Sequence, residues 1–403
     1  MIRFNDGVRW RVSKRGLVLV PPDADAMLLE HPGAAPLADL LVAGDTRDRL
    51  IGALDGAART GTETPVPGTE LIDQMLDAGV IADDAVDEQP DLDGSEEPVA
   101  PARRWTLNRS GLEFAGIEVP ARFLDRYLVP VLISRVGLGV LGAVVLAGVV
   151  ALVAGRPAGP TVSSHPAVDG LLGFLVVLVL AAAHELAHAV ALVHYGGTPR
   201  RAGIGFYWGS VCYYVDSTDA VTLPRRARVI QALAGLAVDV VAISILAITA
   251  HLSGSVLITA VFWRLAVVGL VDLLTNAAPI LELDGHWALA DYLDEPDLAP
   301  RARAAFADRL RRRPSPRWLA LYGGLSLAGG VVLLVGGAFV WWYAAGDLVV
   351  ALFAGNVVDI LVGLYVVVPF ALGLLASLVG LAVETLRRGD PPASAARGAV
   401  TAA

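Results

Sequence analysis

The chain has 403 residues, of which 55% are hydrophobic and only 18% charged, and its mean hydropathy is +0.60. Several apolar runs reach about 20 residues, the length that crosses a bilayer, which excludes an ordinary soluble protein and predicts a polytopic α-helical membrane protein. The net charge is −9, and the single cysteine, Cys212, excludes both an internal disulfide and a zinc site built from cysteines.

Residues 1–82 are predicted to form a small α+β domain. The segments VRWRVS and GLVLVP alternate as two strands joined by a turn at residues 14–16, and PLADLLVAG, TRDRLIGALDG and TELIDQMLDAGVI have apolar residues at helical spacing. Two strands and three short helices are typical of a winged-helix domain. This domain has no surplus of basic residues, which disfavours binding to nucleic acid. The first 16 residues lack the apolar core of a signal peptide.

An acidic stretch separates this domain from the apolar part of the chain. The sequence DDAVDEQPDLDGSEEP carries eight acids and no base, a composition that stays solvated, so we expect a disordered linker over residues 83–102. Residues 103–128 are predicted to form a juxtamembrane hairpin with Gly111 near its turn.

Six apolar segments are predicted to span the membrane. They cover residues 131–154, 170–194, 229–252, 256–275, 318–342 and 357–385. Arginines gather in the loops on one side of these spans, which predicts a bacterial plasma-membrane protein with both termini in the cytoplasm. The chain is therefore divided into a membrane core at 129–300, an arginine-rich cytoplasmic loop at 301–317, two C-terminal spans at 318–388 and a disordered tail at 389–403.

The second predicted span contains HELAH at residues 184–188. Residues four apart share one face of a helix, so His184 and His188 can present their imidazoles to one zinc ion with Glu185 beside it. Charged groups inside a spanning helix are costly unless they are paired or functional, which favours a metal site over a structural role.

A catalytic zinc needs a third protein ligand and an open position for water. The second and fourth predicted spans run in the same direction, so HELAH and the segment that follows the fourth span meet near the cytoplasmic leaflet. Asp284 is the preferred third ligand in that segment. Glu282 and His286 are alternatives there, and His194 is a more distant one.

A second motif, Asn-x-x-Pro-x-x-x-Leu-Asp-Gly, occupies residues 276–285. Together with HELAH in a spanning helix, it resembles the site-2 protease family of intramembrane zinc metalloproteases. The resemblance covers about residues 165–300 and implies zinc as the cofactor. It also implies that the ligands are His184, His188 and Asp284, and that Glu185 is the general base.

The same resemblance suggests residues that contact substrate. Asn276 would donate a hydrogen bond to the substrate backbone or to the developing oxyanion, and Gly285 would let the backbone approach closely. In the third span AGLAVD resembles the Gly-Pro-x-x-Asn patch of the family, with Gly235 kept and Asp239 in place of the asparagine. Asp239 either faces the site or packs against a neighbouring helix.

Residues 202–229 contain glycines and clustered aromatics that do not suit a span, which predicts a hairpin at the membrane surface. Tyr214 lies in it, and the hairpin serves either as an edge strand that holds an extended substrate or as an interfacial anchor. The pattern Tyr214-Val-Asp216-Ser-Thr-Asp219 resembles the peptide zinc metalloprotease branch, many members of which accompany the biosynthesis or export of ribosomally made peptides.

The N-terminal domain resembles winged-helix peptide-recognition domains of enzymes that mature ribosomally synthesised, post-translationally modified peptides. The sequence thus predicts an intramembrane zinc metalloendopeptidase that removes the leader of a precursor peptide, similar to daptide-type membrane metalloproteases. Its partners would be the precursor, the lipid bilayer, and other maturation or export proteins. Two alternatives stay open. One is regulated intramembrane proteolysis of a single-span anti-sigma factor or signal-peptide remnant, and the other is a non-catalytic peptide-binding, export or immunity protein.

Overall fold

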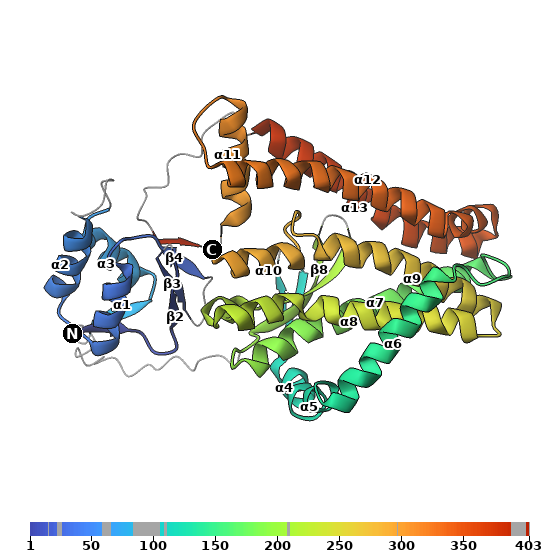
Figure 1. The fold of residues 1–403 in the computed structure, drawn as a ribbon, viewed down its shortest axis with the longest axis horizontal. Helices are drawn as coiled ribbons and strands as arrows, with labels where there is room; N and C mark the ends of the chain where they lie inside the picture. Colours follow the sequence, from blue (N-terminus) through green and yellow to red (C-terminus); the bar gives the residue numbers. More distant parts are fainter. Residues whose placement is uncertain are drawn as a thin grey trace.

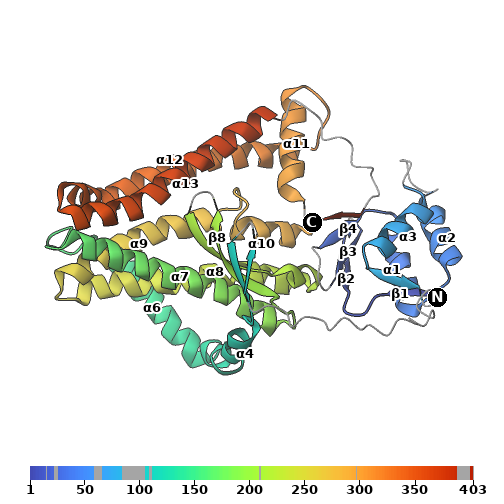
Figure 2. The same ribbon diagram turned by 180° about the vertical axis from the view of Figure 1, so that it is seen from behind.

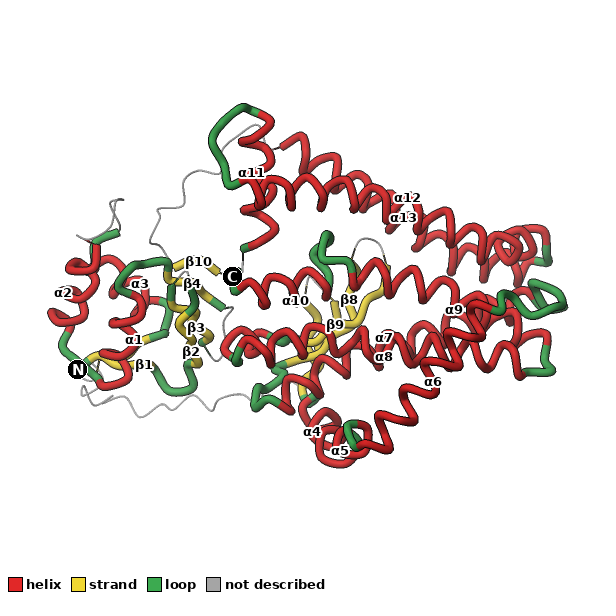
Figure 3. Tube along the Cα trace, in the orientation of Figure 1, coloured by secondary structure: helices red, strands yellow, loops and turns green. Residues whose placement is uncertain are grey.

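A small N-terminal domain stands at one end of the molecule, and a bundle of long helices fills the rest (Figure 1). Strands gather in the N-terminal domain and beside the middle of the bundle (Figure 3). The computed structural model describes residues 1–14, 16–21, 26–58, 66–83, 105–108, 111–207, 210–295, 297–387 and 400–402.

Three helices and several short strands make up the N-terminal domain. The helices are α1 (Ala34–Ala43), α2 (Arg47–Ala58) and α3 (Gly68–Asp77), close to their predicted positions. The strands are β1 (Ile2–Phe4), β2 (Arg9–Val12), β3 (Leu17–Val20), β4 (Met27–Leu29) and β5 (Ile81–Asp83). All four residues of β3 are buried, and its leucines join the leucines of the three helices in one apolar core.

The strands of this domain form two antiparallel sheets. β1 pairs with β5, and the larger sheet has the order β10-β4-β3-β2. β10 is Val400–Ala402, so the prediction of a disordered tail at 389–403 is wrong for these three residues, whose backbone groups pair with the edge of β4. Asp83, predicted to open the acidic linker, instead ends β5, and the rest of that linker lies outside the described residues.

Five helices among the described residues are long and apolar enough to cross a membrane. They are α6 (Arg135–Val153), α7 (Pro166–His194), α8 (Arg225–Leu252), α9 (Val256–Ala277) and α12 (Arg317–Ala354). The chain is therefore a helical membrane protein. α8 packs against α6, α7 and α9, which makes it the centre of the bundle.

The C-terminal spans differ from their prediction. The span predicted to end at residue 342 continues to Ala354, because the apolar run is interrupted only once before Gly355, at Asp347, and nothing there breaks the helix. The chain then turns back into α13 (Val357–Arg387). The described apolar stretch of α13 covers residues 357–368, which is shorter than a span, so the sixth crossing stays a prediction.

The two predicted hairpins join into one antiparallel sheet with the order β6-β7-β8-β9. Its strands are β6 (Trp105–Asn108), β7 (Gly111–Ala115), β8 (Arg201–Tyr207) and β9 (Ser210–Val215). Figure 2 shows this sheet crossing α7 and α8 beside α10 (Asp284–Leu293). β9 is an edge strand of the sheet and packs on α7.

Two predicted segments are helical where a hairpin or a loop was expected. Part of the predicted 103–128 hairpin forms α4 (Glu118–Tyr127), followed by α5 (Val129–Leu132). Glu118 in its first turn and Arg126 in its last complement the helix dipole, which stabilises α4. The predicted 301–317 loop is largely α11 (Leu298–Leu310), because alanines between its arginines bury one face against α12.

Candidate metal centre

The two histidines of HELAH lie on one face of α7, and a hydrogen bond orients each ring. His188 is buried, and its Nδ1 lies 2.8 Å from the carbonyl oxygen of Gln231. A carbonyl only accepts, so Nδ1 of His188 carries a proton, and Nε2 of the neutral imidazole offers its lone pair to the cluster. His184 is oriented in the same way by the carboxylate of Asp239, with 2.8 Å between Nδ1 and Oδ2.

Asp284, the first residue of α10, completes the group. Its Oδ2 lies 3.0 Å from Nε2 of His184 and 3.5 Å from Nε2 of His188, and the two Nε2 atoms are 3.2 Å apart. We call His184, His188 and Asp284 the three-ligand cluster. Ligands about 2.0–2.1 Å from a tetrahedral zinc ion lie about 3.3 Å from one another, so these separations fit one ion.

Three electron-rich atoms facing one another need a cation. Oδ2 of Asp284 is buried and accepts no well-aligned hydrogen bond. With both Nδ1 atoms protonated, both Nε2 lone pairs also point into the cluster, where only a proton or a metal ion relieves the repulsion. The cluster could therefore hold a metal ion, and its His₂Asp donor set suits zinc with one position left open.

Gly235 on α8 leaves the space that the imidazoles occupy. A Cβ at this position would overlap Nε2 of His184 and lie 2.6 Å from Nε2 of His188. Asp239 lies one helical turn further along α8 and bonds His184, so one face of α8 both makes room for the cluster and orients it.

The three alternative ligands are engaged elsewhere. Glu282 forms an ion pair with Arg303. His286 lies 2.8 Å from the hydroxyl of Tyr322, and His194 lies 2.7 Å from Asp125. Each therefore has a structural partner away from the cluster, which leaves Asp284 as the candidate third ligand.

Glu185 lies beside the cluster and also reaches the sheet. Its carboxylate interacts electrostatically with both histidines, with Asp284 and with the backbone of Val215 in β9. This arrangement places the candidate general base next to the edge of β9.

The four residues expected to contact substrate have different neighbours in the structure. Asn276 is in the last turn of α9, and Gly285 packs so closely on the carbonyl of Ala277 that a Cβ would not fit. The hydroxyl of Tyr214 bonds the carboxylate of Glu113 across the sheet, at 2.9 Å. Asp239 faces the site, as one of its two alternatives expected, because its carboxylate bonds the imidazole of His184, and its contact with substrate stays a prediction.

The sequence did not predict two groups near the cluster, the carboxylate of Asp272 and the backbone carbonyl of Gln231. Asp272 on α9 interacts electrostatically with Asp239, His184 and Asp284. An acidic residue within an apolar span indicates a functional site, so the sequence does carry a signal for Asp272. The carbonyl of Gln231 left no signal, because every residue carries one and only the packing of α8 on α7 selects it.

Comparisons of the chain with protein families, with curated proteins and with solved structures found no match. The case for a function therefore rests on two facts about this chain. Two histidines and an aspartate that could hold one metal ion come together, and they do so inside a helical membrane protein.

Proposed function

We propose that this protein is an intramembrane zinc metallopeptidase. The observation that carries the proposal is the three-ligand cluster with Glu185 next to it. Its two histidines lie on α7, a helix that is long and apolar enough to span the membrane. A histidine pair and a carboxylate with one open position are typical of hydrolytic zinc sites.

The residues divide the chemistry between them. His184, His188 and Asp284 would hold the zinc ion, which would lower the pKa of a water and polarise the scissile carbonyl. Glu185 would take a proton from the attacking water and pass it to the leaving amine. Asp239 and the carbonyl of Gln231 keep the imidazoles oriented throughout. Asn276, by resemblance to the site-2 protease family, donates a hydrogen bond to the substrate backbone.

The edge of β9 is the proposed place for the substrate backbone. An extended peptide that adds to this edge gains backbone hydrogen bonds, as in other cases of strand addition. Glu185 interacts with the backbone of Val215 in this strand, so a peptide bound along the edge would lie next to the proposed base.

The proposed substrate is a precursor peptide whose leader is removed during ribosomal peptide maturation or export. Two observations support it. The N-terminal domain stands at the end of the molecule towards which α10 points (Figure 1). Its β4 edge accepts an added strand, since residues 400–402 pair with it. We further propose that the protein lies in a bacterial plasma membrane with the N-terminal domain in the cytoplasm.

The test incubates purified protein in detergent with zinc and with precursor peptides encoded beside its gene, and follows cleavage by mass spectrometry. Glu185→Gln should retain zinc yet cleave about 10²–10⁴-fold more slowly, because only the proton carrier is lost. Cleavage at equal rates by wild type and Glu185→Gln would refute the proposal. So would a wild-type protein that takes up no zinc.

A further inference from the structure

The helix that begins with Asp284 also contacts the N-terminal domain. α10 has 10 residues and is therefore about 15 Å long, with Asp284 at its first position and Asp294 at its C-cap. Asp294 adopts a left-handed conformation, with φ of 57°, which is common where a helix ends. Because one short helix carries both groups, a shift at Asp294 is transmitted to the metal ligand.

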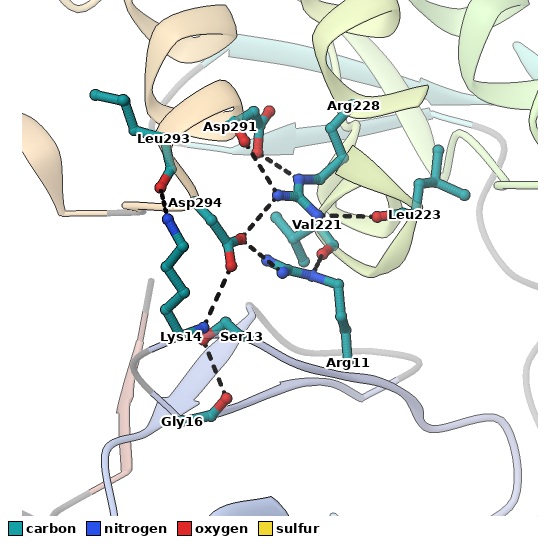
Figure 4. A network of polar contacts seen from close by, with 10 residues as sticks. All are labelled: Arg11, Ser13, Lys14, Gly16, Val221, Leu223, Arg228, Asp291, Leu293 and Asp294. Atoms are coloured by element: carbon teal, nitrogen blue, oxygen red, sulfur yellow. Dashed lines mark hydrogen bonds and ion pairs between the residues drawn. The ribbon is translucent and has the colours of Figure 1, made fainter. Parts of the chain in front are cut away.

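Arg228 of α8 binds the C-terminal end of α10 from inside the core. Its side chain is almost fully buried, and Nε lies 2.5 Å from Oδ1 of Asp291. One Nη donates to Oδ1 of Asp294 at 2.9 Å and to the carbonyl of Asp291 at 3.3 Å, and the other donates to the carbonyl of Leu223 at 3.0 Å (Figure 4). Arg228 therefore fixes the last turn of α10 to α8.

The N-terminal domain binds the same end of α10 from outside, through hydrogen bonds of Arg11 and Lys14. Arg11 in β2 donates to Oδ1 of Asp294 at 2.7 Å and to the carbonyl of Val221 at 2.7 Å. The backbone N–H of Lys14 donates to Oδ2 of Asp294 at 3.2 Å, and its ammonium donates to the carbonyl of Leu293 at 2.8 Å (Figure 4). Asp294 is thus shared between the membrane core and the N-terminal domain.

The contact between the N-terminal domain and α10 depends on the balance of charge among Arg11, Arg228 and Asp294. Burial, together with the nearby cation of Arg228, lowers the pKa of Arg11. Burial would raise the pKa of Asp294, but the hydrogen bond and charge of Arg11, with help from Lys14 and Arg228, lower it overall. Burial raises the pKa of Asp291. The two guanidiniums are therefore held together by the Asp294 carboxylate, and losing one partner of such a buried group is costly.

We propose that Arg228, Arg11 and Lys14 form a clamp that positions Asp284 through α10, so that docking of the N-terminal domain tightens the metal centre. Arg228 is the fixed half of the clamp, because it belongs to the helix that also carries Gly235 and Asp239. Arg11 and Lys14 are the releasable half, because they belong to the domain proposed to receive the precursor. The inference rests on the proposed metal centre.

The test measures zinc affinity of the full-length protein in detergent by competition with a chelator. Arg11→Ala and Asp294→Asn should each weaken zinc binding by about 10-fold, the lower end of the effect of groups that support metal ligands. The double variant should lose no more than Asp294→Asn alone, because that substitution already breaks the ion pair with Arg11. Arg47→Ala is the matched control. Arg47 is a partly exposed arginine of the same domain that pairs with Asp73, and its loss should leave zinc affinity unchanged.

Hydrogen exchange of residues 9–14 measures the docking of the N-terminal domain directly, without relying on zinc affinity. Zinc should slow this exchange in wild type and not in Arg11→Ala, since coupling between two sites is reciprocal. Arg11→Glu forces release, because it places an anion against Asp294. If Arg11→Glu exposes residues 9–14 while zinc affinity stays at the wild-type value, the inference is overturned. If wild type binds no zinc at all, the proposed function fails instead.

Discussion

The two candidate histidine ligands are held by groups of different charge. His184 bonds the carboxylate of Asp239, whereas His188 bonds a neutral backbone carbonyl. A carboxylate partner raises the basicity of an imidazole and so strengthens it as a ligand.

Removing Asp239 should therefore weaken the metal centre without unfolding the protein. We expect Asp239→Ala to reduce zinc affinity by about 10- to 100-fold. Asp239→Asn should have a smaller effect, because its amide oxygen still accepts the imidazole proton. Asp347→Ala is the control, since Asp347 interacts with Arg264 and not with the histidines. Equal zinc affinity in wild type and Asp239→Ala, measured by chelator competition, would contradict the role given to Asp239.

At the scale of elements, α8 organises the centre. It provides space at Gly235, orients His184 through Asp239, and grips α10 through Arg228. α7 carries the histidines, but their geometry is set by the helix packed against it. The metal centre is thus a product of the α7–α8 contact, with α10 adding the third ligand.

Gly235→Ala tests this dependence on close packing. The added methyl group overlaps both imidazoles, so they must move apart, and we expect zinc affinity to fall by about 10-fold or more. Alanine favours the helix over glycine by about 1 kcal/mol, so loss of α8 itself is not expected. Gly139→Ala in α6 is the matched control, because its methyl group would meet nothing within 4 Å. Wild-type affinity in Gly235→Ala would show that the rings are not confined as the structure has them.

The sequence predicted what depends on local pattern. Apolar length located the spans, HELAH located the histidines, and glycine after Asp284 marked a close approach that the structure contains. It did not predict β1, β4 and β5, since three residues are too few for a recognisable alternation. Nor did it predict the joining of two hairpins into one sheet or the contact of Arg11 with Asp294, because partners far apart in the chain leave no periodic signal.

At the scale of the whole molecule, ion pairs join the N-terminal domain to the helical part of the chain. Arg9 pairs with Asp219, at 3.2 Å, and Arg11 with Asp294. The opposite ends of α8 and α9 carry only a short connection around Gly254. This polarity agrees with a cytoplasmic N-terminal domain and predicts that Gly254 faces the other side of the membrane.

Cysteine labelling in intact bacteria tests this orientation. In a Cys212→Ser background, Gly254→Cys should react with a membrane-impermeant maleimide in intact cells. Asp39→Cys, at an exposed position of α1, should react only after the cells are lysed. Both positions are exposed, so a difference in labelling reports sidedness and not burial. Labelling of Asp39→Cys in intact cells would reverse the proposed topology.

The four-stranded sheet beside α7 constrains how the protein is made. β7 precedes two membrane-crossing helices in the chain, yet its partner β8 follows them, so residues 111–115 pair with residues 201–205. During synthesis the first hairpin must wait at the membrane surface until α6 and α7 have both been inserted. Pairing between such distant segments is slow and leaves strand edges exposed meanwhile. Since Glu185 interacts with the backbone of the edge strand of this sheet, its surroundings are complete only after insertion has passed that point. A ribosome-bound fragment that ends before β8 therefore lacks the sheet edge that Glu185 faces.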